Sequence, residues 1–225
     1  MTRRVSSAGS VTSFASSSGD VKVGSFDVSP RGDGYLYVAA RAVTADKPNL
    51  NYDMFPADEL RKSYRTFVGG CVYLNHDNTD PAKARGAIVD ARLHDENPDD
   101  VWVEILMELD EERCPKLCAL IRSGEIDTFS MGCTTEYSTC SVCGREASDE
   151  SEFCEHMLHK GRRYDGVLAY EVCHGIEFFE ESAVYSPADP TARTVAVLDG
   201  DGGGKVGEGG WYDEDGTLVL SSGDL

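Results

Sequence analysis

Apolar residues occupy every second position between residues 101 and 109, and this pattern limits the fold more than any other feature of the chain. The apolar positions are Val101, Val103, Ile105, Met107 and Leu109, and the positions between them are Trp102, Glu104, Leu106 and Glu108. Side chains of a β-strand point alternately to the two faces of a sheet, whereas a helix brings apolar residues together every three or four positions. The segment therefore predicts a strand with one face on a core.

Other segments predict further strands and two helices. Runs rich in branched and aromatic residues predict strands at 34–43, 67–74 (interrupted by two glycines) and 87–93, and another strand carries Ser130. A proline followed by acids at residues 56–59 predicts a helix to about residue 64, and residues 111–123 predict a second helix that Gly124 ends. Strands outnumber helices, so we expect an α+β fold with a small twisted, barrel-like β-sheet and a few flanking helices.

The two ends of the chain differ from its middle in composition. Residues 1–20 are rich in Ser, Gly and Ala and predict a disordered N-terminal arm. Residues 199–225 form a Gly-rich acidic tail with too much glycine for regular structure, although Trp211-Tyr212 and Leu218–Leu220 within it are typical of a docking segment or a hairpin. We therefore place the folded domain at residues 21–198.

Cysteine spacing predicts a metal site inside that domain, at residues 139–160. Cys140 and Cys143 form a Cys-x-x-Cys turn that ends in glycine, and Cys154 and His156 follow eleven residues later. Two thiolates from a tight turn plus a Cys/His pair supply the four tetrahedral ligands that zinc prefers. A closed set of this kind leaves no position for a reactive water, so we expect structural zinc in a zinc-knuckle insertion. The fourth ligand stays open, because His156 has alternatives in His159, Cys133 and the pair Cys173-His174.

The charge of the chain limits its partners. It has 40 acidic and 21 basic side chains, for a formal net charge of −19. An acidic surface repels phosphate backbones, so we expect no nucleic-acid partner, although simple solubility explains the charge equally well. No apolar run approaches the roughly eighteen residues of a membrane helix, and residues 1–20 lack the apolar stretch of a secretory signal. We therefore expect no membrane partner, and no export to a compartment that forms disulfides.

One serine and one histidine lie in surroundings typical of an acyl-transfer site. Ser130 stands between a strand-like run and Gly132, and His76 lies some fifty residues upstream at the polar end of another run. Serine becomes a nucleophile when an imidazole takes its proton. Gly132 would let the backbone approach a substrate and offer its N–H to an oxyanion. Taken singly, these residues are equally typical of an ordinary strand serine and a turn histidine. His94, in a polar stretch, is interpreted as a loop residue.

Three sequence blocks place these residues in a wider context. They are Val72-Tyr73-Leu74-Asn75-His76-Asp77-Asn78 with residues 86–91 behind it, residues 121–132 around Ser130, and Phe179-Glu180-Glu181-Ser182-Ala183-Val184 with residues 187–190 behind it. In this order and spacing they resemble the capsid maturation (prohead) proteases of tailed bacteriophages, which are distantly similar to the herpesvirus assemblins. The resemblance spans residues 66–192, and the Cys-rich insertion departs from it.

The resemblance implies a serine endopeptidase with an assemblin-like β-barrel. It would cleave phage scaffold and major capsid proteins, and also itself, inside the procapsid in the host cytoplasm; homo-oligomerisation stays open. His76 would be the general base and Ser130 the nucleophile, and by position the family's carboxylate falls on Glu180. Strand alternation alone cannot decide between Glu180 and Glu181, and Asp77 and His174 are further alternatives.

Two other classes of function remain compatible with the sequence. The first is a catalytically inactive scaffold or assembly protein of the same fold, against which the intact His76 and Ser130 argue. The second is a zinc-knuckle module that binds a protein partner, with Ser130 incidental.

Overall fold

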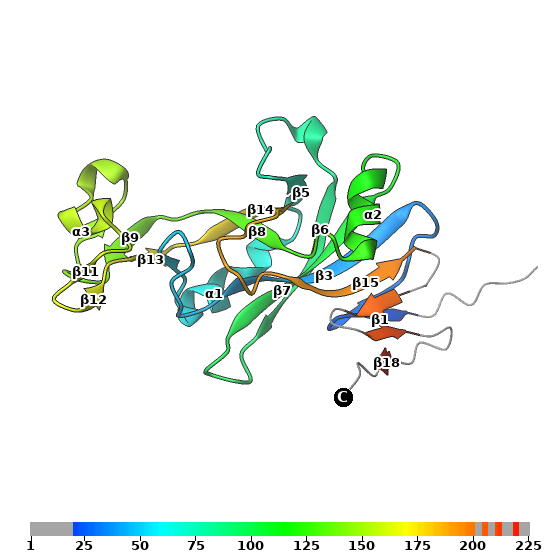
Figure 1. Ribbon diagram of the computed structural model, residues 1–225, viewed down its shortest axis with the longest axis horizontal. Coiled ribbons are helices and arrows are strands. Elements are labelled where there is room, and N and C mark those ends of the chain that lie inside the picture. The colour runs from blue at the N-terminus through cyan, green and yellow to red at the C-terminus, as the bar shows by residue number, and fades with distance from the viewer. Residues whose placement is uncertain (1–19, 201–203, 207–209, 213–217, 221–225) are drawn as a thin grey trace, which may run out of the picture.

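The computed structural model describes residues 20–200, 204–206, 210–212 and 218–220. The predicted N-terminal arm therefore lies outside the described residues, except for Asp20. In this part of the chain the protein is mostly β, with a few short helices (Figure 1).

Seven strands form a curled half-barrel sheet. In spatial order they are β15 (Thr194–Asp199), β3 (Tyr35–Thr44), β7 (Trp102–Asp110), β6 (Gly86–His94), β5 (Cys71–Leu74), β14 (Glu177–Ala183) and β8 (Phe129–Thr134). Neighbouring strands are antiparallel except β5 and β14, which run parallel. The coarse prediction of a small, curled β-sheet is confirmed.

The two ends of this curled sheet meet at one point. Thr128, just before β8, forms an isolated antiparallel bridge with Arg193, just before β15. The Phe129 N–H donates to the Ala192 carbonyl over 3.0 Å, and the Thr194 N–H donates to the Asp127 carbonyl over 2.8 Å. Beyond this bridge β8 is the edge of the sheet, and the rest of its outer side has no strand partner in the described part of the chain.

The period-two pattern of residues 101–109 corresponds to β7 and its buried inner face. Val103, Ile105, Met107 and Leu109 are fully buried, as predicted. The opposite face is covered too, because the hairpin of β1 (Val21–Val23) and β2 (Phe26–Val28) packs over it and buries Leu106. The sheet therefore has cores on both faces in this region.

The helices are short and lie around the sheet. They are α1 (Ala57–Ser63), α2 (Pro115–Ser123), α3 (Glu155–Leu158) and three 3-10 turns at Tyr64–Phe67, Pro81–Lys83 and Glu150–Glu152. Gly124 ends α2 in the left-handed conformation, with φ 76°, as its position predicts. The second helix begins at Pro115 rather than residue 111, since the Asp110 carboxylate accepts the N–H groups of Glu112 and Arg113 in a turn. The strand predicted at 67–74 begins only at Cys71, because Phe67 ends a 3-10 turn and the chain turns again at Gly69, which has φ 92°.

A second, four-stranded sheet extends away from the half-barrel. Its order is β10 (Glu146–Ala147), β9 (Tyr137–Cys140), β13 (Glu171–His174) and β4 (Asp53–Met54). Strands β9 and β13 continue the pairing of β8 and β14 as a long ribbon, which carries α3 and the hairpin of β11 (Arg163–Tyr164) and β12 (Val167–Leu168) at its far end (Figure 1). We call residues 140–170 the metal module.

Three short strands lie in the segment for which glycine content predicts no regular structure. They are β16 (Gly204–Val206), β17 (Gly210–Tyr212) and β18 (Leu218–Leu220), and they extend the sheet beyond β15 to ten strands. The expectation of an irregular tail is not met there, because antiparallel pairing satisfies the backbone whatever the side chains are. The hairpin alternative given for Trp211-Tyr212 and Leu218–Leu220 is present, since β17 and β18 pair antiparallel. The rest of the predicted tail, except residues 199 and 200, lies outside the described residues.

Within the described ranges, no helix has both the length and the apolar character needed to cross a membrane.

Candidate active site and metal centre

The structure brings His76 and Glu180 together. His76 follows β5, which pairs in parallel with β14, and Glu180 lies opposite Cys71 in that register. Asn75 and His76 both have positive φ values, 53° and 55°, so the chain turns sharply after β5 and directs the imidazole back over β14. Residues other than glycine rarely adopt this backbone conformation, and those that do are concentrated at functional sites.

A hydrogen bond fixes the imidazole on the carboxylate. His76 Nδ1 lies 2.7 Å from Glu180 Oε1, and Glu180 is only 1% exposed. This hydrogen bond raises the pKa of His76 above its ordinary value, because the carboxylate stabilises the imidazolium more than burial opposes it. The pair can therefore hold one imidazole tautomer, with Nε2 free to accept a proton.

Ser182 completes this arrangement, although it is not among the site residues predicted from the sequence. Its hydroxyl donates to Glu180 Oε2 over 2.8 Å and accepts the backbone N–H of His76 over 3.1 Å. Ser182 thus fixes both partners of the pair from below. A signal was available, because a polar residue two positions after Glu180 on a strand points to the same face.

The three alternatives to Glu180 have other environments. Asp77 pairs with Lys83 at the surface, over 2.6 Å. His174 stacks on Tyr137 and contacts the hydroxyl of Thr139. Glu181 points into the core, where it is fully buried and neither carboxylate oxygen has a hydrogen-bond partner among the described residues. Burial raises the pKa of Glu181 well above its ordinary value, so this carboxyl is neutral at higher pH than an exposed one.

Ser130 lies in the same pocket as the His76–Glu180 pair. The pocket has a volume of about 550 Å³ and is lined by His76, Glu180 and the segment 129–133 of β8, which faces residues 188–192 and 47–53. Ser130 is half-buried and sits opposite Ser182 in the β8–β14 register. No hydrogen bond joins Ser130 to His76 in the described structure. Bonds of this kind often form only when a substrate is bound.

Gly132 gives space to the carboxylate rather than a donor to the pocket. A Cβ atom at this position would lie 2.6 Å from Glu180 Oε1, closer than real Cβ contacts. Backbone groups alternate along a strand. Phe129 bonds outward to Ala192, and Thr128 bonds to Val184 on the β14 side. The N–H of Met131 therefore faces the open edge, and that of Gly132 faces β14, which differs from the oxyanion role predicted for Gly132.

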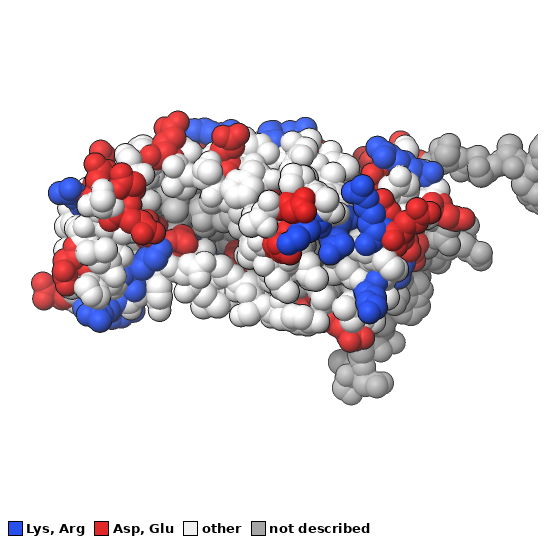
Figure 2. All heavy atoms as spheres, turned by 90° about the horizontal axis from the view of Figure 1, so that it is seen from above, with Lys and Arg blue, Asp and Glu red and all other residues white. Residues whose placement is uncertain are grey.

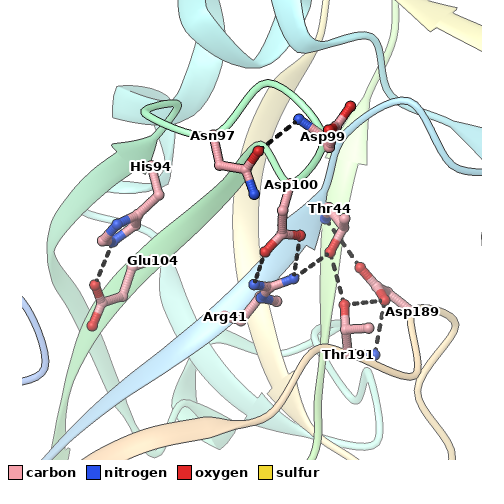
Figure 3. Close-up of polar contacts among 9 residues, drawn as sticks. All are labelled: Arg41, Thr44, His94, Asn97, Asp99, Asp100, Glu104, Asp189 and Thr191. Atoms are coloured by element: carbon pink, nitrogen blue, oxygen red, sulfur yellow. Dashed lines mark hydrogen bonds and ion pairs between the residues drawn. The ribbon is translucent and has the colours of Figure 1, made fainter.

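Hydrogen bonds hold the wall of the pocket opposite β8 (Figure 3). Asp189 accepts the N–H of Thr44 over 3.0 Å and both the N–H and the hydroxyl of Thr191, over 2.9 and 2.7 Å. The hydroxyls of Thr44 and Thr191 lie 2.7 Å apart. Beside Thr44 and Thr191, Arg41 forms two hydrogen bonds with Asp100, of 3.1 and 2.9 Å. Residues 188–192 are thus tied to β3.

His94 differs from its prediction as a loop residue. It ends β6, stacks on Trp102 and places Nε2 2.7 Å from Oε2 of the buried Glu104 (Figure 3). The other Glu104 oxygen accepts the N–H of Ser25 over 3.1 Å. This second His–Glu pair does not line the pocket that contains Ser130. It supports the β1–β2 hairpin instead.

The four predicted metal ligands converge in the metal module. The ligand atoms of Cys140, Cys143, Cys154 and His156 all lie within 4.8 Å of one another. The Cys143 and Cys154 sulfurs are 3.6 Å apart, and His156 Nδ1 is 3.7 Å from the Cys140 sulfur and 3.9 Å from the Cys154 sulfur. Tetrahedral ligands at about 2.3 Å from zinc lie roughly 3.8 Å from each other. The cluster can therefore bind a metal ion such as zinc.

The alternative fourth ligands lie outside this cluster. His159 bonds to the backbone of Glu155, Cys173 is buried on β13, and Cys133 lines the Ser130 pocket, where partial burial raises the pKa of its thiol to about 12. Gly144, with φ 70°, returns its N–H to the Cys140 carbonyl and forms the tight turn that the Cys-x-x-Cys spacing predicts.

Comparisons with protein-family models, with curated proteins and with solved structures find no match to this chain. The resemblance to prohead proteases therefore stays a prediction from the sequence blocks.

Proposed function

We propose that this protein is a serine endopeptidase of the prohead-protease type, with an assemblin-like fold and a structural zinc. It would act in phage capsid maturation on scaffold and capsid protein segments and on its own tails. The observation that carries the proposal is the His76–Glu180 pair, which opens into a pocket that also contains Ser130.

In this proposal each group has a chemical role that the geometry supports. Glu180 accepts a hydrogen bond from the Nδ1–H of His76 and stabilises the imidazolium, so that Nε2 can take the hydroxyl proton of Ser130. The serine oxygen then attacks a peptide carbonyl, and His76 returns the proton to the leaving amine. Water hydrolyses the acyl-enzyme by the same proton transfers in reverse. The N–H of Met131 is in position to donate to the oxyanion.

The open edge of β8 favours a peptide over a small ester as substrate. Among the described residues, the outward backbone groups of β8 beyond the Phe129 N–H, which bonds to Ala192, have no strand partner, and this edge borders the pocket. An extended chain can add to such an edge through main-chain hydrogen bonds, which position its carbonyl beside the strand serine. Figure 2 shows a hollow on the face seen from above, bordered mainly by uncharged residues with a few acidic groups, while acidic and basic groups both lie towards the two ends of the molecule.

Labelling with a fluorophosphonate, followed by peptide mapping, tests this proposal. We expect the label on Ser130, and its loss in Ser130→Ala and His76→Ala. Ser123→Ala, which changes an exposed serine at the end of α2, is the matched control and should label normally. A folded wild-type protein that takes up no label at Ser130 would contradict the proposal and favour the inactive assembly protein.

A further inference from the structure

One wall of the Ser130 pocket is a tight turn before β4. Asn49, Asn51 and Asp53 line the pocket from this side. The Asn49 side-chain oxygen accepts the N–H groups of Asn51 and Asp53 over 2.9 and 3.0 Å, and Tyr52 has φ 61°. The turn holds its own shape locally, and on one side the N–H of Leu50 donates to the Ala188 carbonyl over 2.8 Å; the side towards the ribbon is fixed by another contact.

Lys160 of the metal module supplies that contact. Its ammonium group lies 2.7 Å from Asp53 Oδ1 and 2.6 Å from Glu171 Oε1. Glu171 is buried on β13, which pairs in parallel with β4. Without the ammonium group, two largely buried carboxylates would face each other, and their repulsion would separate the turn from the ribbon.

A second contact beside Lys160 depends on a glycine. A Cβ atom at Gly161 would lie 2.4 Å from Cε2 of Tyr52, so the Gly161 backbone packs directly on that ring. Gly161 itself is held in the module, since its N–H donates to the Ala169 carbonyl over 2.7 Å. The Tyr52 carbonyl accepts the N–H of Glu171 over 2.9 Å. The turn is thus attached to the module by a charge, a ring and a backbone bond.

The position of Lys160 depends in turn on the metal ligands. Lys160 lies two residues after α3, a helix of four residues that carries His156 and follows Cys154. The module's own apolar core consists of Cys140, Ala147 and Met157 with a few half-buried neighbours. A core of this size does not hold a fold by itself, and small modules of this kind obtain their folding free energy from the bound metal.

We propose that the metal module is a brace for the substrate pocket, in which Lys160 transmits metal occupancy to the Asn49–Asp53 wall. Lys160 is a positioning residue, since it touches Asp53 and Glu171 rather than the reacting atoms. When the metal is bound, the module holds the Asn49–Asp53 wall in place opposite β8. When the metal is lost, this wall becomes free to move. This inference depends on the proposed function in one respect only, namely that the molecule bound in the pocket is a peptide.

Hydrogen–deuterium exchange on the full-length protein measures the wall directly. Three samples are compared: zinc-loaded protein, the same protein after treatment with dipicolinate, and zinc-loaded Lys160→Met. We expect the amides of residues 49–54 to exchange at least tenfold faster in the last two, with zinc still near one equivalent in the variant. Lys116→Met, which changes an exposed lysine of α2, is the matched control and should match wild type. Asp53→Asn removes the Lys160–Asp53 ion pair but also one of the two carboxylates, so exchange at residues 49–54 should rise by less than in Lys160→Met.

Unchanged exchange at residues 49–54 in zinc-free protein, with faster exchange at residues 140–160, would overturn the inference. Cleavage of fluorescein-labelled β-casein gives a second readout. Lys160→Met should raise KM at least fivefold, while kcat and the rate of fluorophosphonate labelling at Ser130 stay within about twofold; an unchanged KM would also overturn it. Absence of Ser130 labelling in the wild type contradicts the protease proposal alone, because the exchange experiment needs no activity.

Discussion

Replacing Glu180 with glutamine removes the charge beside His76 and keeps the shape of the side chain. Glu180 accepts from two groups, His76 Nδ1 at 2.7 Å and the Ser182 hydroxyl at 2.8 Å. A glutamine at this position has one oxygen and one NH₂ group, so it can accept from only one of them. The Ser182 oxygen already accepts the N–H of His76, which favours the orientation that keeps Ser182 as the donor. The amide NH₂ then faces Nδ1.

That orientation reverses the imidazole tautomer. Nδ1 must accept the amide hydrogen, so the proton moves to Nε2, which can no longer take the proton of Ser130. The imidazolium also loses its counter-charge in a site where Glu180 is only 1% exposed. The corresponding change in serine proteases lowers kcat about 10⁴-fold, or about 5.4 kcal/mol in activation free energy. We expect a loss of this size for Glu180→Gln.

The assay is the rate of Ser130 labelling by a fluorophosphonate as a function of pH. Glu180 raises the pKa of His76, and only the neutral imidazole acts as base, so wild-type labelling should rise with pH through a midpoint above about 6.5. In Glu180→Gln the residual rate should have its midpoint at lower pH. Glu181→Gln, one residue along the same strand, is the control, since it points into the core and should keep both rate and midpoint.

Two results would refute this reasoning. A Glu180→Gln protein within a few-fold of the wild-type rate would remove the orienting role from Glu180. A severe loss in Asp77→Asn or His174→Ala, with Glu180→Gln mild, would transfer the role to that residue.

Three further predictions concern stability, packing and metal. Burial raises the pKa of Glu181, so its neutral form stabilises the fold below the ordinary carboxyl pKa, and this contribution is lost as pH rises through the folded-state pKa. In the wild type, the free energy of unfolding should therefore fall by about 1.4 kcal/mol per pH unit above pH ~4.5, and Glu181→Gln should remove this fall. Urea unfolding at several pH values measures it. The same dependence of unfolding free energy on pH in both proteins would contradict the prediction. Gly132→Ala would place Cβ 2.6 Å from Glu180 Oε1 and should cost about 1–3 kcal/mol of folding free energy and most of the fluorophosphonate labelling; labelling at the wild-type rate would contradict this. Protein purified without added metal should contain one zinc per chain by elemental analysis, because structural zinc contributes on the order of 10 kcal/mol to local folding. Cys143→Ser removes one ligand and should lose the zinc. A zinc content well under one equivalent in reduced wild-type protein would show that the metal prediction is wrong.

The sequence predicts the parts of this protein that depend on local patterns. The alternation at residues 101–109 predicts a buried strand face, and the Cys-x-x-Cys spacing predicts ligands that converge in the structure. Both patterns are contained in short continuous segments of the sequence, residues 101–109 and 140–156. Gly124 is placed correctly for the same reason, since a helix ending in the left-handed conformation favours glycine locally.

Features that depend on strand pairing could not be predicted in this way. Alternation puts Glu180 and Glu181 on opposite faces, but only the parallel register of β14 with β5 decides which of them meets His76. The sequence predicts a loop at His94, because its partner Glu104 is on the neighbouring strand β7 and is identified only once β6 and β7 are paired. The role of Gly132 depends on the Glu180 side chain of the neighbouring strand. Each case requires a distant segment to be placed first.

The bridge between Thr128 and Arg193 sets a limit on the proteins that can enter the pocket. It closes the start of β8, so only about four residues, or roughly 13 Å of strand, remain open for a partner chain. A folded protein must bring its whole surface to this short open stretch, whereas an unstructured linker needs to place only a few extended residues there. Under the proposed function, cleavage would distinguish substrates by whether they are folded. Completed capsid subunits would then survive beside an active enzyme, with no inhibitor needed to protect them.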